Sequence, residues 1–260
     1  MNEPVRPKKH LGQHFLTDQL RAQKIVQDFL KVLPAGNSVL EIGPGTGVLT
    51  QFLLGQCAYT GIDIDTESIE FLKVHFSPFA NYFIEQDVLT YAFQNHIRYS
   101  IIGNFPYNIS SPIMFQILEN RNCVDTVVGM FQKEVAQRMA EKPGTKTYGI
   151  LSVLLQAYYQ IEYLYTVHEN AFNPPPRVKS AVIRLIRKPQ QDLQCRYEPF
   201  KRLVKTCFNQ RRKTIRNSIK PLQVKLQIQH PLLDLRPEQL GVKDFEILCL
   251  LLFPDSKITS

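Results

Sequence analysis

Four consecutive residues, Asn104-Phe105-Pro106-Tyr107, combine the groups needed to hold and activate an aromatic amine. The side-chain oxygen of Asn104 and the main-chain carbonyl of Phe105, fixed in place by Pro106, could each accept a hydrogen bond from an exocyclic amino group. Two such bonds would localise the nitrogen lone pair, and the ring of Tyr107 would offer a face for a purine. No strong general base is needed, because a nitrogen that becomes cationic loses its proton easily. The alternative is an ordinary turn, since Asn and Pro are both common in turns.

A glycine-rich segment earlier in the chain could hold a nucleotide-like cofactor. Residues 39–47, VLEIGPGTG, are typical of a strand that runs into a glycine turn, and a helical pattern follows at 48–56. Gly43 and Gly45 can adopt positive φ and let the backbone approach a ligand closely. The spacing G-x-G-x-G departs from the G-x-G-x-x-G of dinucleotide sites. With Glu41 it gives E-x-G-x-G-x-G, the pattern of Rossmann-like methyltransferases.

Two acidic residues follow the next two predicted strands. Asp63 lies 20 residues after Gly43, where a carboxylate can accept hydrogen bonds from both ribose hydroxyls of an adenosine. Asp87 could accept a bond from an adenine amino group. Each acid alone could be a turn residue or a helix cap. Together with the glycine segment they favour S-adenosylmethionine as the cofactor.

Short β-rich runs alternate with helical patterns through the first half of the chain. We expect strands at 38–42, 60–64, 82–85, 99–103 and 126–131, and helices between them, including 48–56 and 111–120. Strands separated by helices predict an α/β fold with a mostly parallel sheet. Ligand sites in such sheets form outside the carboxyl ends of the strands, which places residues 104–107 beside the cofactor.

The pattern changes after a helical run at 150–160. Residues 162–168 and 181–187 have the character of strands, and Asn173-Pro174-Pro175-Pro176 between them cannot continue a sheet or helix. We expect an antiparallel hairpin at the edge of the sheet. Beyond residue 188 the chain is helical and basic in character. The predicted domains are therefore an α/β domain at 1–188 and a small helical domain at 189–260.

Basic residues are concentrated in this second domain. The 260-residue chain has a net charge of +8, whereas residues 196–225 alone, with ten Lys or Arg and one acid, carry +9. A nearly neutral body with one dense basic segment favours a nucleic-acid partner over a merely solvated helix face. Arg212, Arg216 and Lys220 recur every four residues and would form one phosphate-binding stripe on a helix. The RNA-binding candidates are Arg211, Arg212, Lys213, Arg216 and Lys220.

Composition excludes several other classes of protein. No apolar run approaches the roughly 20 residues of a membrane span, and the first 14 residues lack the apolar core of a signal peptide. The five cysteines are dispersed, with no C-x-x-C pair, which argues against a disulfide framework or a zinc site. We expect no bound metal. We expect a cytoplasmic protein, monomeric and without membrane contact.

Several sequence blocks resemble the family of small-subunit (16S) ribosomal RNA adenine N6,N6-dimethyltransferases. The blocks cover almost the whole chain: 8–16 (KKHLGQHFL), 39–50 (VLEIGPGTGVLT), 86–87, 103–112 (GNFPYNISSP), 132–138 (QKEVAQR), 148–152, 172–180 (FNPPPRVKS) and 208–218 (FNQRRKTIRNS). The resemblance implies a Rossmann-like class I methyltransferase domain followed by a small helical domain. It also implies dimethylation of two adjacent adenosines near the 3′ end of that RNA, in small-subunit biogenesis.

The resemblance assigns further site residues by position. Cofactor contacts would fall on His14, Leu16, Gly43, Asp63, Asp87 and Asn104, and Phe172 would face the target base opposite Tyr107, with core packing as the equal alternative. His14, Asp63 and Phe105 stand where the family usually has Asn, Glu and Leu, and Ile150 replaces a frequent Arg. Because Asp63 is one methylene shorter, its ribose contact is the least secure of these assignments. His14 is expected to make a backbone or edge contact, with no acid–base role.

Three alternatives remain beside this assignment. An adenine methyltransferase of the antibiotic-resistance type, acting on large-subunit RNA, would share the cofactor segment and N-x-P-Y. A non-catalytic assembly or transcription factor could keep the fold, although intact Asn104, Pro106 and Tyr107 argue against lost chemistry. A DNA adenine methyltransferase would normally carry a larger recognition domain.

Overall fold

The computed structural model describes residues 5–189, 193–223 and 229–258. The chain divides into two compact units, one formed by Met1–Ala136 and Ile161–Arg187, the other by Gln137–Gln160 and Lys188–Ser260. This differs from the single boundary near 188 that the sequence predicted, because residues 137–160 group with the C-terminal helices. The physical reason is aromatic packing: the ring centroids of Tyr158 and Tyr197 are 5.9 Å apart, and those of Tyr148 and Phe208 are 6.1 Å apart.

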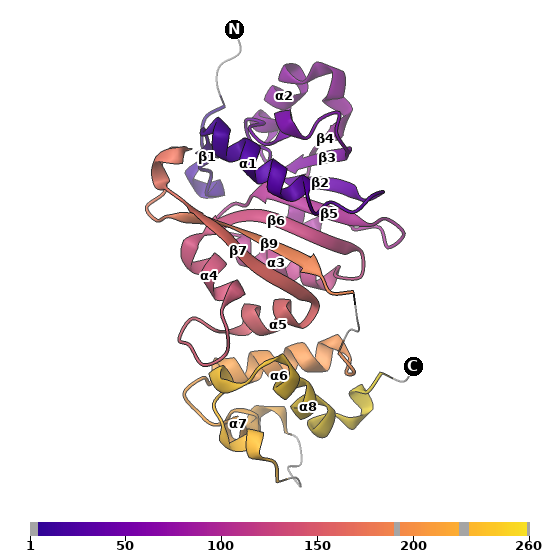
Figure 1. The fold of residues 1–260 in the computed structure, drawn as a ribbon, viewed down its shortest axis with the longest axis vertical. Helices are drawn as coiled ribbons and strands as arrows, with labels where there is room; N and C mark the ends of the chain where they lie inside the picture. Colours follow the sequence, from indigo (N-terminus) through magenta and orange to yellow (C-terminus); the bar gives the residue numbers. More distant parts are fainter. Residues whose placement is uncertain (1–4, 190–192, 224–228, 259–260) are drawn as a thin grey trace. The chain divides into compact units, whose positions relative to one another are not determined.

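A seven-stranded sheet with the order β4-β3-β2-β5-β6-β9-β7 forms the centre of the first unit (Figure 1). The pairs β2–β3, β2–β5, β3–β4 and β5–β6 are parallel, whereas β6 and β9 are antiparallel. The predicted mostly parallel sheet is confirmed, with strand boundaries shifted by a few residues. The strands are β2 (Ser38–Ile42), β3 (Ala58–Asp63), β4 (Phe83–Glu85), β5 (Tyr99–Asn104), β6 (Val124–Gln132), β7 (Tyr159–Val167) and β9 (Ser180–Arg187).

Helices precede or connect these strands, and an aspartate side chain caps the start of each of the first two, α1 and α2. The side chain of Asp18 accepts a hydrogen bond from the Arg21 N–H and begins α1, whose Ile25 and Phe29 are buried in the core. Asp65 caps the start of α2 in the same way, through the Glu67 N–H. Caps of this kind satisfy N–H groups that have no partner inside the helix. The helices are α1 (Gln19–Leu30), α2 (Thr66–His75), α3 (Ser110–Glu119) and α4 (Lys133–Ala140), of which α4 spans the division between the units.

The segment 48–56, expected to be an α-helix, is not one. Residues Thr50–Phe52 form a short 3-10 helix and the flanking residues form turns. Gly47 and Gly55, with φ of 79° and 78°, interrupt the helical conformation on both sides. The glycine segment after β2 therefore leads into a compact turn.

A second, two-stranded sheet ties the N-terminal region to a distant segment. β1 (Phe15–Leu16) pairs antiparallel with β8 (Phe172–Asn173), so that Phe15 lies opposite Asn173. A 3-10 turn, Lys9–Leu11, and Gly12 with φ of 65° precede β1. The pairing fixes the backbone next to the carboxyl edge of the main sheet, where the site lies.

The second unit is a group of helices around an apolar core. Its helices are α5 (Ile150–Tyr158), α6 (Tyr197–Asn209), α7 (Ile215–Ser218) and α8 (Val242–Leu252). α6 buries Phe200, Leu203 and Val204 on one face, each of which stabilises the fold by about 1.5–3 kcal/mol. The predicted stripe through Arg212, Arg216 and Lys220 is wrong, because α6 ends at Asn209 and the three residues lie in a turn, in α7 and in a 3-10 turn that contains Pro221. Lys225, counted in the basic segment, lies outside the described residues.

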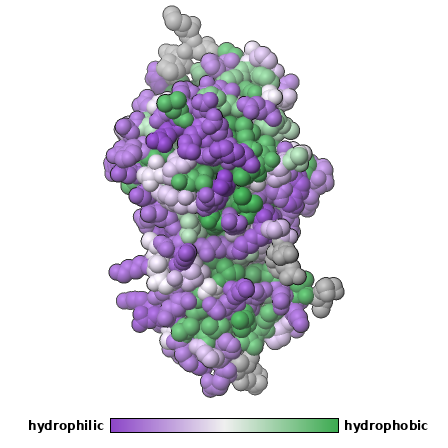
Figure 2. Space-filling model, viewed as in Figure 1, coloured by the Kyte–Doolittle hydropathy of each residue, from purple (hydrophilic) through white to green (hydrophobic). Residues whose placement is uncertain are grey.

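None of the described helices combines the length and the apolar character that crossing a bilayer would require. On the face drawn in Figure 2, hydrophobic residues occur in patches separated by hydrophilic ones.

Candidate active site

A cavity with about 910 Å³ of empty space, part of it open to solvent, lies at the carboxyl edge of the parallel strands. The segments that follow β2, β3, β4 and β5 line it, and the N-terminal residues 11–15 complete the lining. The cavity lies outside the strand ends, where the sequence placed the candidate site.

The glycine segment after β2 forms one wall of this cavity. Gly43 and Gly45 have φ of 68° and 55°, a conformation that side-chain-bearing residues rarely adopt. A Cβ atom on Gly45 would lie 2.9 Å from the ring of Phe15, so this position also lacks room for a side chain. The main-chain N–H of Gly43 donates to the Ile62 carbonyl at 2.9 Å, which joins the turn to β3.

Asp63 and Asp87, the two predicted acids, both line the cavity. Asp63 accepts hydrogen bonds from the Gly45 N–H at 3.3 Å and the Asp65 N–H at 3.0 Å, one on each carboxylate oxygen. Burial raises the pKa of Asp63 to about 6 in spite of these bonds. One oxygen of Asp87 accepts from the Leu89 N–H at 2.9 Å. Carboxylate oxygens have further lone pairs, so both acids can still accept bonds from hydroxyl or amino groups of a ligand.

Asn104, at the end of β5, holds a buried oxygen ready to accept a hydrogen bond. Its side-chain nitrogen Nδ2 donates to the His14 carbonyl at 2.8 Å. A carbonyl can only accept, so this bond sets the amide with Nδ2 toward His14 and Oδ1 on the other side. Among the described residues, Oδ1 is buried without a hydrogen-bond partner. An unpaired buried acceptor costs free energy, so its persistence points to a ligand that donates to it.

The side chain of Phe105 serves the core rather than the cavity opening. Its ring is 1% exposed and stacks on Phe131 with centroids 4.7 Å apart. Its N–H donates to the Met130 carbonyl at 3.1 Å, which continues the β5–β6 pairing beyond Asn104. Ring and N–H together fix the backbone where Phe105 and Pro106 line the cavity.

Tyr107 and His14 form an aromatic pair at the cavity. Their ring centroids are 5.4 Å apart with planes tilted by 31°. The Tyr107 hydroxyl hydrogen-bonds to the Ser180 hydroxyl, and burial raises the pKa of the phenol, so the ring stays neutral. The Nδ1 atom of His14 lies 2.8 Å from the Pro174 carbonyl. Partners from residues 174 and 180 therefore fix both rings of the pair.

Two predicted site residues lie elsewhere. Leu16 is 2% exposed and Phe172 is 4% exposed, and both belong to the hydrophobic core. They sit opposite each other in the β1–β8 pair and are absent from the lining of the cavity as described, so the core-packing alternative for Phe172 is the one the geometry favours. The neighbouring Phe15 lines the cavity instead.

Four further residues line the cavity that the sequence analysis did not assign to the site. Gln13, Phe15, Ile64 and Gln86 line it, and Ile64 is 51% exposed although it directly follows a buried strand. The sequence offered a signal for Ile64, which is an apolar residue next to the strand-end acid Asp63. An adenine ring needs an apolar surface beside its polar partners, so such a residue is a candidate for the cofactor site.

Glu41, the first residue of the glycine pattern, points away from the cavity. The residue is 1% exposed, and its carboxyl group accepts from the Thr50 hydroxyl at 2.8 Å and the Tyr59 hydroxyl at 2.6 Å. Burial raises the pKa of Glu41 to about 7. The residue supports the turn after the glycine segment from within the protein.

Two of the five predicted RNA-binding residues, Arg211 and Arg216, form polar contacts within the second unit. Arg211 donates to the carbonyls of Lys146 at 2.5 Å and Thr145 at 2.8 Å and pairs with Glu238 at 3.7 Å. Arg216 is bonded to Asp234 at 3.0 Å. The exposed candidates are Arg212, Lys213 and Lys220.

The residues present fit an adenosyl cofactor with a charged sulfonium end. A positive-φ glycine turn, carboxylates at two strand ends and an unpartnered amide oxygen surround one cavity. On a mostly parallel seven-stranded sheet, this arrangement defines a class I S-adenosylmethionine-dependent methyltransferase.

The chain belongs to the ribosomal RNA adenine dimethylase family, whose profile matches residues 5–238. It is 51% identical over 252 residues to ribosomal RNA small subunit methyltransferase A of Flavobacterium johnsoniae, covering 95% of each chain. A dimethyladenosine transferase from Plasmodium falciparum has a similar structure, with a TM-score of 0.77 and 27% identity over 94% of this chain and 98% of the other. The 23S rRNA methyltransferase ErmE matches with a TM-score of 0.66 and 25% identity over 90% and 98%.

Proposed function

We propose that this enzyme transfers methyl groups from S-adenosylmethionine to the N6 amine of two adjacent adenosines near the 3′ end of small-subunit ribosomal RNA. Membership of the ribosomal RNA adenine dimethylase family supports the chemistry. The name of the Flavobacterium johnsoniae relative supports the choice of subunit. Its partner would be small-subunit ribosomal RNA, or the small subunit itself, and its role would lie in small-subunit biogenesis in the cytoplasm, as a monomer.

The buried, unpartnered Oδ1 atom of Asn104 is the observation on which this mechanism depends. In the first transfer, Oδ1 and the Phe105 carbonyl would accept the two hydrogens of the adenine N6 amine and localise the nitrogen lone pair. The methylated nitrogen would then lose one proton to solvent, and in the second transfer one of the two oxygens would accept the single remaining N–H. The ring of Tyr107 stacks on the adenine, a contact worth about 1–3 kcal/mol. When bound, S-adenosylmethionine supplies the electrophilic methyl carbon. The rate enhancement then comes from alignment in a cavity with little water.

The cofactor would be held by the strand-end residues. Asp63 would accept from the ribose hydroxyls and Asp87 from the adenine amine, and the turn at Gly43 and Gly45 would admit the backbone close to the ligand. His14 would contribute its main chain, which already orients Asn104. The exposed Arg212, Lys213 and Lys220 would contact RNA phosphates, with Arg211 and Arg216 at their margins.

Asn104→Ala tests the mechanism. We expect its transfer rate to fall by about 10²–10³, the usual effect of removing one aligned hydrogen-bonding group from a transition state. The dissociation constant for S-adenosylmethionine, measured by calorimetry, should change far less. Asn95→Ala, an exposed asparagine outside the cavity, is the matched control and should retain the wild-type rate. A wild-type rate in Asn104→Ala would refute the role of this side chain.

The target RNA is tested by offering purified small and large subunits with labelled cofactor. We expect label in the small subunit only, on adenines that mass spectrometry identifies as dimethylated. Label confined to the large subunit would instead favour the activity that the name of ErmE describes.

A further inference from the structure

The N-terminal segment, residues 8–15, contributes a wall of the cavity. Groups that do not line the cavity hold this segment in place. Residues 11–15 line the cavity, and the His14 carbonyl orients Asn104. After this segment, the β1–β8 pair fixes its end. Its beginning is fixed by a different group, the carboxylate of Asp65.

Asp65 is 2% exposed and bonds to two residues of this segment. Its Oδ2 atom accepts from the Gln13 side-chain nitrogen at 2.9 Å, and its Oδ1 atom pairs with the ammonium group of Lys8. The Lys8 N–H in turn donates to the Gln13 side-chain oxygen at 2.8 Å. Lys8, Gln13 and Asp65 thus close a ring of bonds around the turn at 9–12, which carries Leu11 and Gly12 into the cavity wall.

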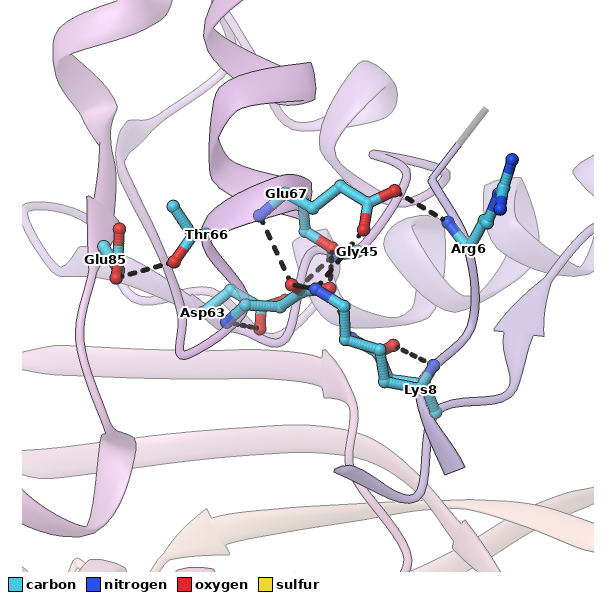
Figure 3. A network of polar contacts seen from close by, with 10 residues as sticks. Arg6, Lys8, Gly45, Asp63, Thr66, Glu67 and Glu85 are labelled. Atoms are coloured by element: carbon cyan, nitrogen blue, oxygen red, sulfur yellow. Dashed lines mark hydrogen bonds and ion pairs between the residues drawn. The ribbon is translucent and has the colours of Figure 1, made fainter. Parts of the chain in front are cut away.

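The main chain of Asp65 also contacts the part of the cavity wall that Asp63 and Gly45 form. The Asp65 N–H donates to Oδ1 of Asp63 at 3.0 Å, and Oδ2 of Asp63 accepts from the Gly45 N–H at 3.3 Å. Figure 3 shows Lys8 reaching toward the start of α2, beside Glu67 and the pair formed by Asp63 and Gly45. One buried residue therefore connects the N-terminal wall, the proposed ribose acceptor and the glycine turn.

We propose that Asp65 is a positioning residue for the cofactor, which holds residues 8–14 as a preformed wall and fixes the carboxylate of Asp63. The inference rests on the cofactor site proposed above. A wall that is ordered before binding spares the cofactor the entropy cost of ordering it. Loss of the Asp65 carboxylate therefore weakens cofactor binding more than it slows the transfer step.

Asp65→Asn separates this role from helix capping. Asn caps helices about as well as Asp, so the start of α2 is preserved. The capping oxygen Oδ1 also pairs with Lys8, so the NH₂ group of the substituted amide takes the place of Oδ2 and faces the side-chain nitrogen of Gln13 and the Ser68 hydroxyl. Lys8→Met removes the ammonium group from the other side of the same contact. Glu67→Gln is the matched control, since Glu67 also pairs with Lys8, at 3.3 Å, but has a 43% exposed side chain.

The readouts are the dissociation constant of S-adenosylmethionine by calorimetry and amide hydrogen exchange of residues 8–14 in the full chain. For Asp65→Asn and Lys8→Met we expect about tenfold weaker binding, the effect of ordering one or two additional side chains. Exchange of residues 8–14 should be faster without cofactor and return toward the wild-type rate with it. The KM for S-adenosylmethionine should rise more than kcat falls. Glu67→Gln should change binding by less than about twofold.

Asp87→Ala serves as the reference for the cofactor site, because it removes a proposed cofactor acceptor without touching Asp65. If Asp87→Ala binds the cofactor as wild type does, the proposed cofactor site is wrong and the inference falls with it. If Asp87→Ala weakens binding while Asp65→Asn and Lys8→Met do not, the inference alone is overturned. Unchanged exchange of residues 8–14 in both variants would also overturn it.

Discussion

The side-chain nitrogen of Asn104 donates a hydrogen bond to the main-chain oxygen of His14 at 2.8 Å, across 90 residues of sequence. This bond fixes the orientation of the amide, because it holds Nδ2 at His14 and leaves Oδ1 buried without a hydrogen-bond partner among the described residues. The catalytic oxygen of the proposed mechanism is therefore positioned by an N-terminal segment that has no part in the chemistry itself.

Asn104→Asp tests the importance of this orientation. The substitution keeps an acceptor toward the cavity but places a second carboxylate oxygen against the His14 carbonyl, where no donor remains. We expect the side chain to rotate away and the single-turnover rate to fall by about 10² or more. Cofactor affinity should fall much less. A rate close to wild type would mean that the Asn104–His14 bond is not needed to orient the acceptor.

The buried carboxyl of Glu41 should make stability depend on pH. Its folded-state pKa of about 7 lies above the ordinary 4.5, so the folded state binds the proton more tightly than the unfolded state does. The stability this contributes is complete below about pH 4.5 and is lost as pH rises through 7. Glu41→Gln imitates the protonated form and can still accept from Thr50 and Tyr59.

We therefore expect the unfolding free energy of Glu41→Gln, relative to that of wild type, to increase by about 2–3 kcal/mol as pH rises from 5 to 8. Urea unfolding at each pH measures this difference. The pKa of Asp63 is also raised, but Asp63 is present in both proteins, so its contribution to the pH dependence cancels in the comparison. A difference that is constant with pH would contradict a raised pKa at Glu41.

Cofactor affinity should fall in mild acid because of Asp63. Burial raises its pKa to about 6, and ribose hydroxyls donate to the ionised carboxylate, so a proton competes with the cofactor. Below pH 6 we expect the dissociation constant of S-adenosylmethionine to rise by up to about tenfold per pH unit. In Asp63→Asn the binding should be weaker at pH 8 and nearly flat between pH 5 and 7. Calorimetric titration across this range checks both, and an acid-dependent loss retained in Asp63→Asn would assign the proton to another group.

Arg211 and Arg212 are adjacent in sequence but should have different roles. Arg211 bonds to two main-chain carbonyls of the loop 141–147, whereas Arg212 is exposed. Arg211→Ala should lower the unfolding free energy by about 2 kcal/mol through the lost charged hydrogen bonds. Arg212→Ala should leave thermal unfolding unchanged and weaken RNA binding, with the salt-dependence slope reduced by about 1.

Thermal unfolding and RNA binding at several salt concentrations, measured on both variants, separate the two roles. Equal losses of RNA affinity with no change in stability would show that the contacts of Arg211 with the loop do not contribute to the fold.

The sequence by itself determined the sheet, the cavity edge and most of the chemistry. Alternating strand and helix periods place successive strand ends on one edge, so Gly43, Gly45, Asp63, Asp87 and the segment after Asn104 had to converge. Local patterns suffice there, because each of these residues lies at or within a few residues of the end of a strand whose direction is fixed by the parallel topology.

The tertiary structure alone decided which neighbours of these residues face the cavity. Leu16 and Phe172 enter the core because β1 and β8 pair in one particular register, and a shift by one residue would exchange the faces. Arg211 turns inward because carbonyls 65 and 66 residues away meet its guanidinium. The role of Asp65 likewise depends on Lys8 and Gln13, more than 50 residues away. Contacts between distant segments depend on how the whole chain packs, and no local period or spacing records them.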